Sequence, residues 1–232
     1  MGKPFYNAWL GAGLAAIVLL AAPAMAQQSK YREGLHYFKI DQAGAPSSDG
    51  KVEVIEAFSY MCPHCNTFEP FINSWLERKP EHVKFTRMPV IFGRGTWELY
   101  ARAYVTADNM GVAQDAHGPL MDALYKEKKI MRNMEEVAEF YSQFGVTANE
   151  FLGTSKSFAV DATLSKNQRA LQNYGVSGTP TMIVNGKYLV KGSEAVPNYD
   201  TMLEVVDTLI AQEAAAMASS AEGEASNAAE GR

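Results

Sequence analysis

The chain has 232 residues, of which 47% are apolar and 20% are charged. This apolar fraction is ordinary for a globular protein and excludes a chain that is disordered throughout. The formal net charge of -5 argues against a nucleic-acid-binding protein, which needs a basic surface, and the 2 cysteines are too few for a disulfide-stapled mini-protein or a four-cysteine zinc site.

Residues 1–26 have the pattern of a secretory signal peptide. Lys3 precedes an apolar run at residues 10–22, and Pro23 then leads to a small-residue site at residues 24–26 (AMA). A membrane anchor is the alternative, but the run is shorter than the roughly 20 residues that cross a bilayer. We therefore predict cleavage after Ala26 and export to an oxidising compartment.

Strand and helix patterns alternate in the next part of the chain. A short strand is predicted at residues 36–40, and residues 51–60 (KVEVIEAFSY) have the β-branched and aromatic composition of a buried strand. Helical spacing begins at Pro63 and should end before Pro80, and residues 82–91 form a further strand candidate. The apolar face of this helix comprises Phe68, Phe71, Ile72, Trp75 and Leu76.

The strand signal disappears between residues 96 and 173. Helical stretches are expected from about Thr96, near residues 113–125 and 134–144, and over residues 149–174.

Two short apolar runs then flank Asn185-Gly186, a dipeptide that strongly predicts a β-hairpin because both residues tolerate positive φ. One helical face follows, formed by Tyr199, Met202, Leu203, Val206 and Ile210. Residues 214–232 are small, polar and low in complexity, which predicts a frayed or disordered tail.

The predicted order is therefore β-β-α-β, a helical block, and β-β-α. Because neither flank alone makes a complete sheet, the helical block is an insertion between sheet strands. The expected divisions are a signal peptide at 1–26, the first part of the sheet domain at 27–94, the helical insertion at 95–173, the second part of the sheet domain at 174–218, and a flexible tail at 219–232.

Both cysteines lie in one Cys62-Pro63-His64-Cys65 motif at a strand-to-helix junction. At the helix N-terminus, unpaired backbone N–H groups and the helix dipole favour a thiolate on Cys62. Pro63 suits the first helical position, and His64 adds a dipole, and when protonated a charge, beside the sulfur. A stabilised thiolate is a good leaving group, so the oxidised pair should readily pass its disulfide to a substrate.

Helical position distinguishes the two sulfurs. Cys65 lies one turn before Phe68 on the apolar face and should be buried, whereas Cys62 should be exposed at the helix tip. We therefore assign Cys62 as the sulfur that a substrate thiolate attacks, and Cys65 as the sulfur that resolves the mixed disulfide.

Three other interpretations of the cysteine pair are weaker. A structural disulfide across so short a loop adds little stability. A zinc site lacks a second ligand pair, since His36, His82 and His117 show no ligand spacing, and haem attachment requires a histidine where Asn66 stands.

Two segments together resemble the DsbA family of periplasmic thiol–disulfide oxidoreductases. They are residues 58–65 (FSYMCPHC), with Glu56 upstream, and residues 176–188 (VSGTPTMIVNGKY). The resemblance covers about residues 37–210, although the helical middle matches in length and position more than in residues. It implies an α/β thioredoxin-like fold with an inserted all-helical domain.

The same resemblance implies that Pro180 is cis and lies against the cysteine pair. The backbone N–H and C=O of Thr179 would then be free to pair with a substrate strand, whatever its sequence. Without the resemblance, an ordinary loop proline before a strand would be the preferred interpretation.

Glu56 is a third candidate, because it lies in a strand that should be buried on both faces. A buried carboxyl group has a raised pKa and can relay a proton to or from Cys65, directly or through water. The alternative is a carboxylate at the polar end of the strand or one paired with a cation such as Arg87. Glu69, one turn beyond the motif, either tunes its charge or is solvated.

The resemblance implies a dithiol oxidase that donates the Cys62–Cys65 disulfide to reduced exported proteins with free cysteines. Reoxidation would come from a quinone-linked membrane partner of the DsbB type. We expect a periplasmic monomer with no bound cofactor, no metal and no nucleic-acid partner, because thiol–disulfide exchange needs none of these.

Two alternatives remain open. A periplasmic reductase or isomerase could share the fold, although residues 27–50 are too short for the separate dimerisation domain of such isomerases. A non-catalytic peptide-binding chaperone would keep its activity after Cys62→Ser.

Overall fold

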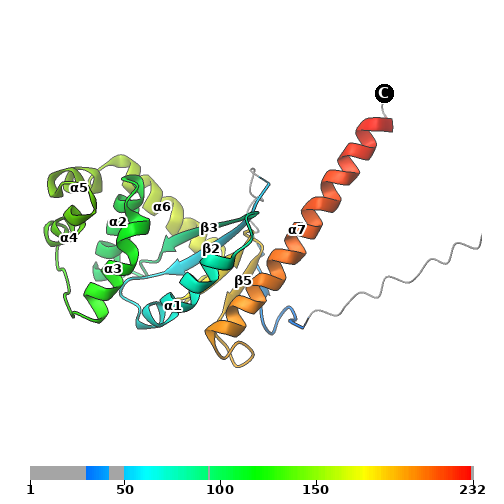
Figure 1. Ribbon diagram of the computed structural model, residues 1–232, viewed down its shortest axis with the longest axis horizontal. Helices are drawn as coiled ribbons and strands as arrows, with labels where there is room; N and C mark the ends of the chain where they lie inside the picture. Colours follow the sequence, from blue (N-terminus) through cyan, green and yellow to red (C-terminus); the bar gives the residue numbers. More distant parts are fainter. Residues whose placement is uncertain (1–29, 42–49, 94, 231–232) are drawn as a thin grey trace, which may run out of the picture.

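The computed structural model describes residues 30–41, 50–93 and 95–230 of the chain. It contains one mixed β-sheet with helices on both faces and a helical block at one end (Figure 1). The predicted signal peptide and its cleavage site lie outside the described residues.

The sheet has five strands in the order β1-β5-β4-β2-β3. Strands β2 and β3 are parallel, whereas β4 is antiparallel to β2, β5 to β4 and β1 to β5. The strands are β1 (Phe38–Lys39), β2 (Val52–Phe58), β3 (Val83–Pro89), β4 (Thr181–Val184) and β5 (Tyr188–Lys191). Segments from both ends of the chain thus complete one sheet, which confirms the predicted fold class.

The helices follow the predicted order with one difference. The helices are α1 (Pro63–Arg78), α2 (Gly95–Asn109), α3 (Ala113–Tyr125), α4 (Met134–Tyr141), a 3-10 turn η1 (Ser142–Phe144), α5 (Ala148–Ser155), α6 (Phe158–Asn173) and α7 (Tyr199–Glu230). The single helix expected over residues 149–174 is two helices. Ser157 causes the break, because its side chain accepts a hydrogen bond from the N–H of Val160 and so caps a new helix.

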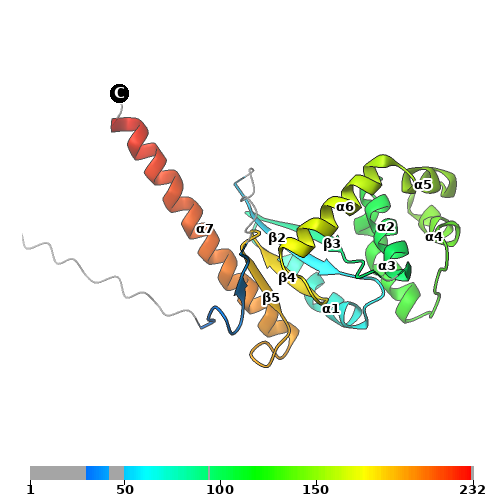
Figure 2. The same cartoon turned by 180° about the vertical axis from the view of Figure 1, so that it is seen from behind.

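Helices α1 and α7 cover one face of the sheet, and the C-terminal end of α6 covers the other face (Figures 1 and 2). Trp75 of α1 is fully buried between the sheet and α7, and its indole N–H donates to Asp207 of α7 at 2.6 Å. The apolar face predicted for α7 is confirmed, since Met202, Val206 and Ile210 are buried there.

A separate apolar core fills the helical block and reaches the sheet through Phe58, the last residue of β2. Tyr60, Cys62 and Cys65 belong to this same cluster, together with buried residues of α2, α3, α4 and α5. The cysteine pair therefore lies where the sheet domain meets the helical block.

The β4–β5 hairpin turns at Asn185 and Gly186, which have φ values of 52° and 63° as the dipeptide predicts. The Asn185 side chain donates to the buried carboxylate of Glu213 at 2.6 Å, and Lys187 Nζ bonds the same carboxylate at 2.7 Å. These bonds fasten the turn to the middle of α7.

The end of the chain differs from the prediction. Helix α7 continues to Glu230, where we expected a frayed or disordered tail from residue 214. The alanines of this segment have the highest helix propensity, and Ser219 and Ser220 donate to carbonyl groups one turn back, so low complexity here does not prevent a helix. Within residues 30–41, 50–93 and 95–230, none of the helices combines the length and the hydropathy that a membrane span requires.

Candidate active site

Helix α1 begins directly after Cys62, which is its N-cap residue with extended backbone angles. Pro63 occupies the first helical position, as predicted, and the carbonyl oxygen of Cys62 accepts from the N–H of Cys65 at 3.0 Å. The Cys62 side chain makes no capping hydrogen bond. The first N–H groups of the helix therefore act on its sulfur as nearby dipoles rather than as a regular cap.

The prediction that Cys62 is exposed is wrong. Only 6% of Cys62 is exposed, against 0% of Cys65, and both are free thiols. The loop before β4 covers Cys62, because the carbonyl oxygen of Thr179 lies 3.4 Å from its sulfur. Cys62 is still the more accessible sulfur, so the predicted order of the two holds.

The surroundings of the two thiols shift their pKa values in opposite directions. A hydrogen bond from Cys65 lowers the pKa of Cys62, and Thr179 and the N–H groups of Cys65 and His64 add to this effect against the opposing effect of burial. Burial raises the pKa of Cys65, and the neighbouring Cys62 and Glu56 raise it further. Cys62 is thus the thiolate of the pair, and Cys65 keeps its proton.

The Thr179–Pro180 peptide bond is cis, as the resemblance implies. Beside it lies a cavity of about 340 Å³ whose lining includes His64, Thr179, Pro180, Tyr199 and Met202. The His64 residue is exposed at this cavity, and its carbonyl oxygen accepts a hydrogen bond from the Tyr199 hydroxyl at 3.0 Å. The cavity therefore connects the cysteine motif, the cis-proline loop and the start of α7.

Glu56 is 1% exposed and bonds Arg87 Nε at 3.0 Å. The two residues lie directly opposite each other in the parallel β2–β3 register. Burial raises the pKa of Glu56 to about 7; Arg87 opposes this shift and Glu69 adds to it. Glu56 is therefore buried, as predicted, and it is also paired with Arg87, as the alternative had it; its proton-relay role stays a prediction.

Sequence reasoning did not identify His117 as part of this buried network. His117 on α3 bonds Tyr60 at 2.9 Å and Glu69 at 3.1 Å, which makes it a buried link between the helical block and the sheet domain. A histidine at an inward position of an amphipathic helix was the available signal. In the described part of the chain, no group of three or more His, Cys, Asp or Glu side chains could hold a metal ion.

Comparison with known proteins places this site in a family. The family model for the DSBA-like thioredoxin domain matches residues 53–204. The chain belongs to this family. The "Thiol:disulfide interchange protein DsbA" of Pseudomonas aeruginosa is 40% identical over 192 residues, covering 82% of this chain and 90% of that protein. The DsbA of Pseudomonas syringae pv. tomato is 38% identical over 211 residues, covering 90% and 97%.

Solved structures agree with this assignment. The crystal structure of Pseudomonas aeruginosa DsbA superposes with a TM-score of 0.73 at 38% identity, over 80% of this chain and 96% of that chain. A cysteine-to-serine variant of Proteus mirabilis DsbA with a non-covalently bound peptide has a TM-score of 0.65 at 26% identity, over 78% and 99%. The fold class and the enzyme class, a protein thiol–disulfide oxidoreductase, are thereby confirmed.

Proposed function

We propose that the protein oxidises cysteine pairs in exported proteins by donating its Cys62–Cys65 disulfide. A substrate thiolate attacks the Cys62 sulfur, the disulfide breaks, and Cys65 leaves with the electron pair and takes up a proton. A second substrate thiolate then attacks the substrate sulfur that is bound to Cys62. This forms the substrate disulfide and releases Cys62 as a thiolate, so the protein gains two electrons and the substrate loses two.

The observation that carries this proposal is the lowered pKa of Cys62 beside a Cys65 that keeps its proton. Stabilising the thiolate stabilises the reduced protein relative to its disulfide, and this drives disulfide transfer to the substrate. Glu56 supplies the proton that Cys65 takes up as it leaves, because burial raises the pKa of this carboxyl group to about 7 and its charge acts on the Cys65 thiol. Pro63 and His64 hold the turn that presents Cys62.

We assign substrate binding to the loop at Thr179 and Pro180 and to the adjoining cavity. A substrate strand would pair with the backbone of Thr179, which positions its cysteine near Cys62 without reading its sequence. The peptide bound to the Proteus mirabilis relative contains a cysteine, which is the kind of ligand this geometry requires.

We extend the proposal to the cellular setting by resemblance. Residues 1–26 direct export to the periplasm and are removed after Ala26, and a quinone-linked membrane oxidase of the DsbB type regenerates the disulfide. The mature protein acts as a monomer on reduced exported proteins.

Trapping experiments test the assignment of the two sulfurs. With a reduced, unfolded substrate that carries one cysteine and an added oxidant, Cys65→Ala should accumulate a mixed disulfide through Cys62, because neither Cys65 nor a second substrate thiol is present to resolve it. Cys62→Ser should trap nothing and should lose oxidase activity; unchanged activity would favour the chaperone alternative. Equilibration with glutathione buffers of known potential tests the direction of electron transfer. A strongly reducing potential would make the protein a reductase rather than an oxidase.

A further inference from the structure

One cation is shared by two buried carboxyl groups in this protein. Arg87 bonds Glu56 through Nε at 3.0 Å and Glu69 through Nη2 at 3.4 Å. The exposed fractions of the three side chains are 3%, 1% and 11%. Because an ionised carboxylate in such a site needs a full set of partners, the two acids compete for the guanidinium charge.

Glu69 has the additional partners. His117 Nε2 lies 3.1 Å from its Oε2, and Asn73 Nδ2 donates to its Oε1 at 3.1 Å. Burial lowers the pKa of His117, so its ring is neutral and carries one hydrogen. Because the Glu69 carboxylate can only accept, that hydrogen lies on Nε2, and Nδ1 accepts from the Tyr60 hydroxyl 2.9 Å away.

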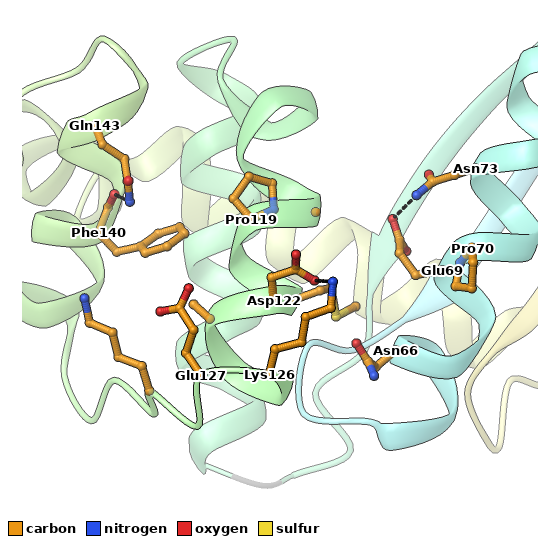
Figure 3. Close-up of a pocket in the computed structure, with 14 residues that line it drawn as sticks. Asn66, Glu69, Pro70, Asn73, Pro119, Asp122, Lys126, Glu127, Phe140 and Gln143 are labelled. Carbon is orange, nitrogen blue, oxygen red and sulfur yellow. Dashed lines mark hydrogen bonds and ion pairs between the residues drawn. The ribbon is translucent and has the colours of Figure 1, made fainter.

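Glu69 also has contact with solvent, which Glu56 lacks. Glu69 and Asn73 line a cavity of about 790 Å³ between α1 and α3, and Figure 3 shows the Asn73 amide bonded to the Glu69 carboxylate at its edge. Hydration from this cavity further favours the charged form of Glu69, while the sealed position of Glu56 favours the neutral form.

We propose that Glu69 is a positioning residue for the redox reaction: held by His117 and Asn73, it shares the charge of Arg87 that Glu56 would otherwise have alone, and this keeps the proton on Glu56. This inference rests on the proposed function, in which Glu56 protonates Cys65. In each turnover the proton moves from the Glu56 carboxyl group to the Cys65 sulfur as the disulfide breaks, and Cys65 returns it to Glu56 when the disulfide is formed again.

Few other groups near Glu56 change their charge in the pH range in which Glu56 titrates. Burial raises the pKa of the surrounding phenols, so they stay neutral across the range in which Glu56 titrates. The titratable or charged groups that face this site are Tyr60 in the loop after β2, Cys62, Cys65 and Glu69 of α1, Arg87 of β3, Tyr104 of α2 and His117 of α3. Glu69 is therefore the one acidic side chain among them that competes with Glu56 for Arg87.

The test follows the titration of Glu56 directly, in reduced protein labelled with carbon-13 at glutamate carboxyl groups and assigned by Glu56→Gln. Glu69→Gln should lower the titration midpoint of the Glu56 carboxyl group by about one pH unit or more, because Arg87 then pairs with Glu56 alone. Glu77→Gln is the matched control, since Glu77 lies exposed on the same helix, and it should leave the midpoint unchanged. Glu69→Asp should restore much of the wild-type value.

The rate of disulfide donation is the second measurement. At pH 7, disulfide donation by Glu69→Gln should be about fivefold slower, and its pH midpoint should fall together with that of Glu56. If Glu69→Gln does not fold, His117→Gln serves instead, because it weakens the hold on Glu69 and should shift Glu56 in the same direction.

An unchanged Glu56 midpoint in a folded variant would overturn the inference, even if stability fell. The NMR titration needs no turnover, so it also separates the two proposals. A shifted midpoint in a protein without oxidase activity would reject the proposed function alone.

Discussion

The Cys62 sulfur lies 3.4 Å from the carbonyl oxygen of Thr179, a residue 117 positions later in the chain. The redox group and the loop proposed to bind the substrate backbone are therefore in contact before any substrate arrives. A bound strand would need no large rearrangement to bring its cysteine to Cys62, and the same contact explains why Cys62 is buried.

The reduced protein should be more stable than the oxidised protein, and the difference should depend on pH. Because the pKa of Cys62 is lower in the folded reduced protein than in the unfolded chain, its stabilisation is fully present above the unfolded value of about 8.5. It is lost as the pH falls through the folded value. Melting temperatures of both redox forms across this range test the prediction; equal values at every pH would contradict it.

Glu56→Gln should stabilise the folded protein at alkaline pH. The folded pKa of about 7 lies above the ordinary carboxyl value, so the wild-type protein loses stability as the pH rises between the two. The variant avoids this loss, and urea unfolding at pH 8 should show a gain of up to about 3 kcal/mol. Its disulfide donation should nevertheless be slower. A variant that is destabilised at pH 8 and equally fast would disprove the proton-donor assignment.

Tyr199→Phe should loosen the active-site turn without disturbing the core. The change removes the hydroxyl that donates to the His64 carbonyl oxygen, but it keeps the ring contacts with Phe68 and Phe71. We expect a loss of about 1 kcal/mol in unfolding free energy and faster amide exchange at residues 63–66. Tyr199→Ala, which also removes the ring, should cost clearly more. An unfolding free energy of Tyr199→Phe equal to that of the wild type would show that the hydroxyl contributes nothing.

Glu213→Ala should destabilise the fold while sparing the redox chemistry. It leaves Lys187 and the buried Asn185 amide without the carboxylate that joins the hairpin turn to α7. The expected cost is about 2 kcal/mol in urea unfolding, with an unchanged redox potential. Glu33→Ala, which breaks the exposed pair with Lys39, should cost less than about 1 kcal/mol. A similar cost for both variants would refute the argument.

Local patterns in the sequence predicted the parts of the fold that depend on local rules. The Asn185-Gly186 turn and the helix that starts at Pro63 follow from backbone preferences, and the predicted bounds of α3 match the structure. The cis geometry of Pro180 came from the family resemblance, because an X-Pro bond alone favours the trans form.

Features that depend on tertiary contacts could not be predicted in the same way. The burial of Cys62 results from a loop more than a hundred residues away, which no helical spacing reports. The link from His117 to Glu69 requires the packing of α3 against α1, and each residue alone has an ordinary structural explanation. The helical end of α7 was missed because low complexity was weighted above the helix propensity of alanine.

The most direct test of the whole account is the titration of Cys62 in the reduced protein, followed by thiolate ultraviolet absorbance and by alkylation rate, with Cys65→Ala as a companion sample. We predict that Cys62 ionises well below the ordinary cysteine value of about 8.5. The midpoint should rise in Cys65→Ala, because the hydrogen bond from the neighbouring thiol is the largest cause of the shift. A Cys62 that titrates like a free cysteine in solution would contradict the account, because disulfide donation would then have no driving force.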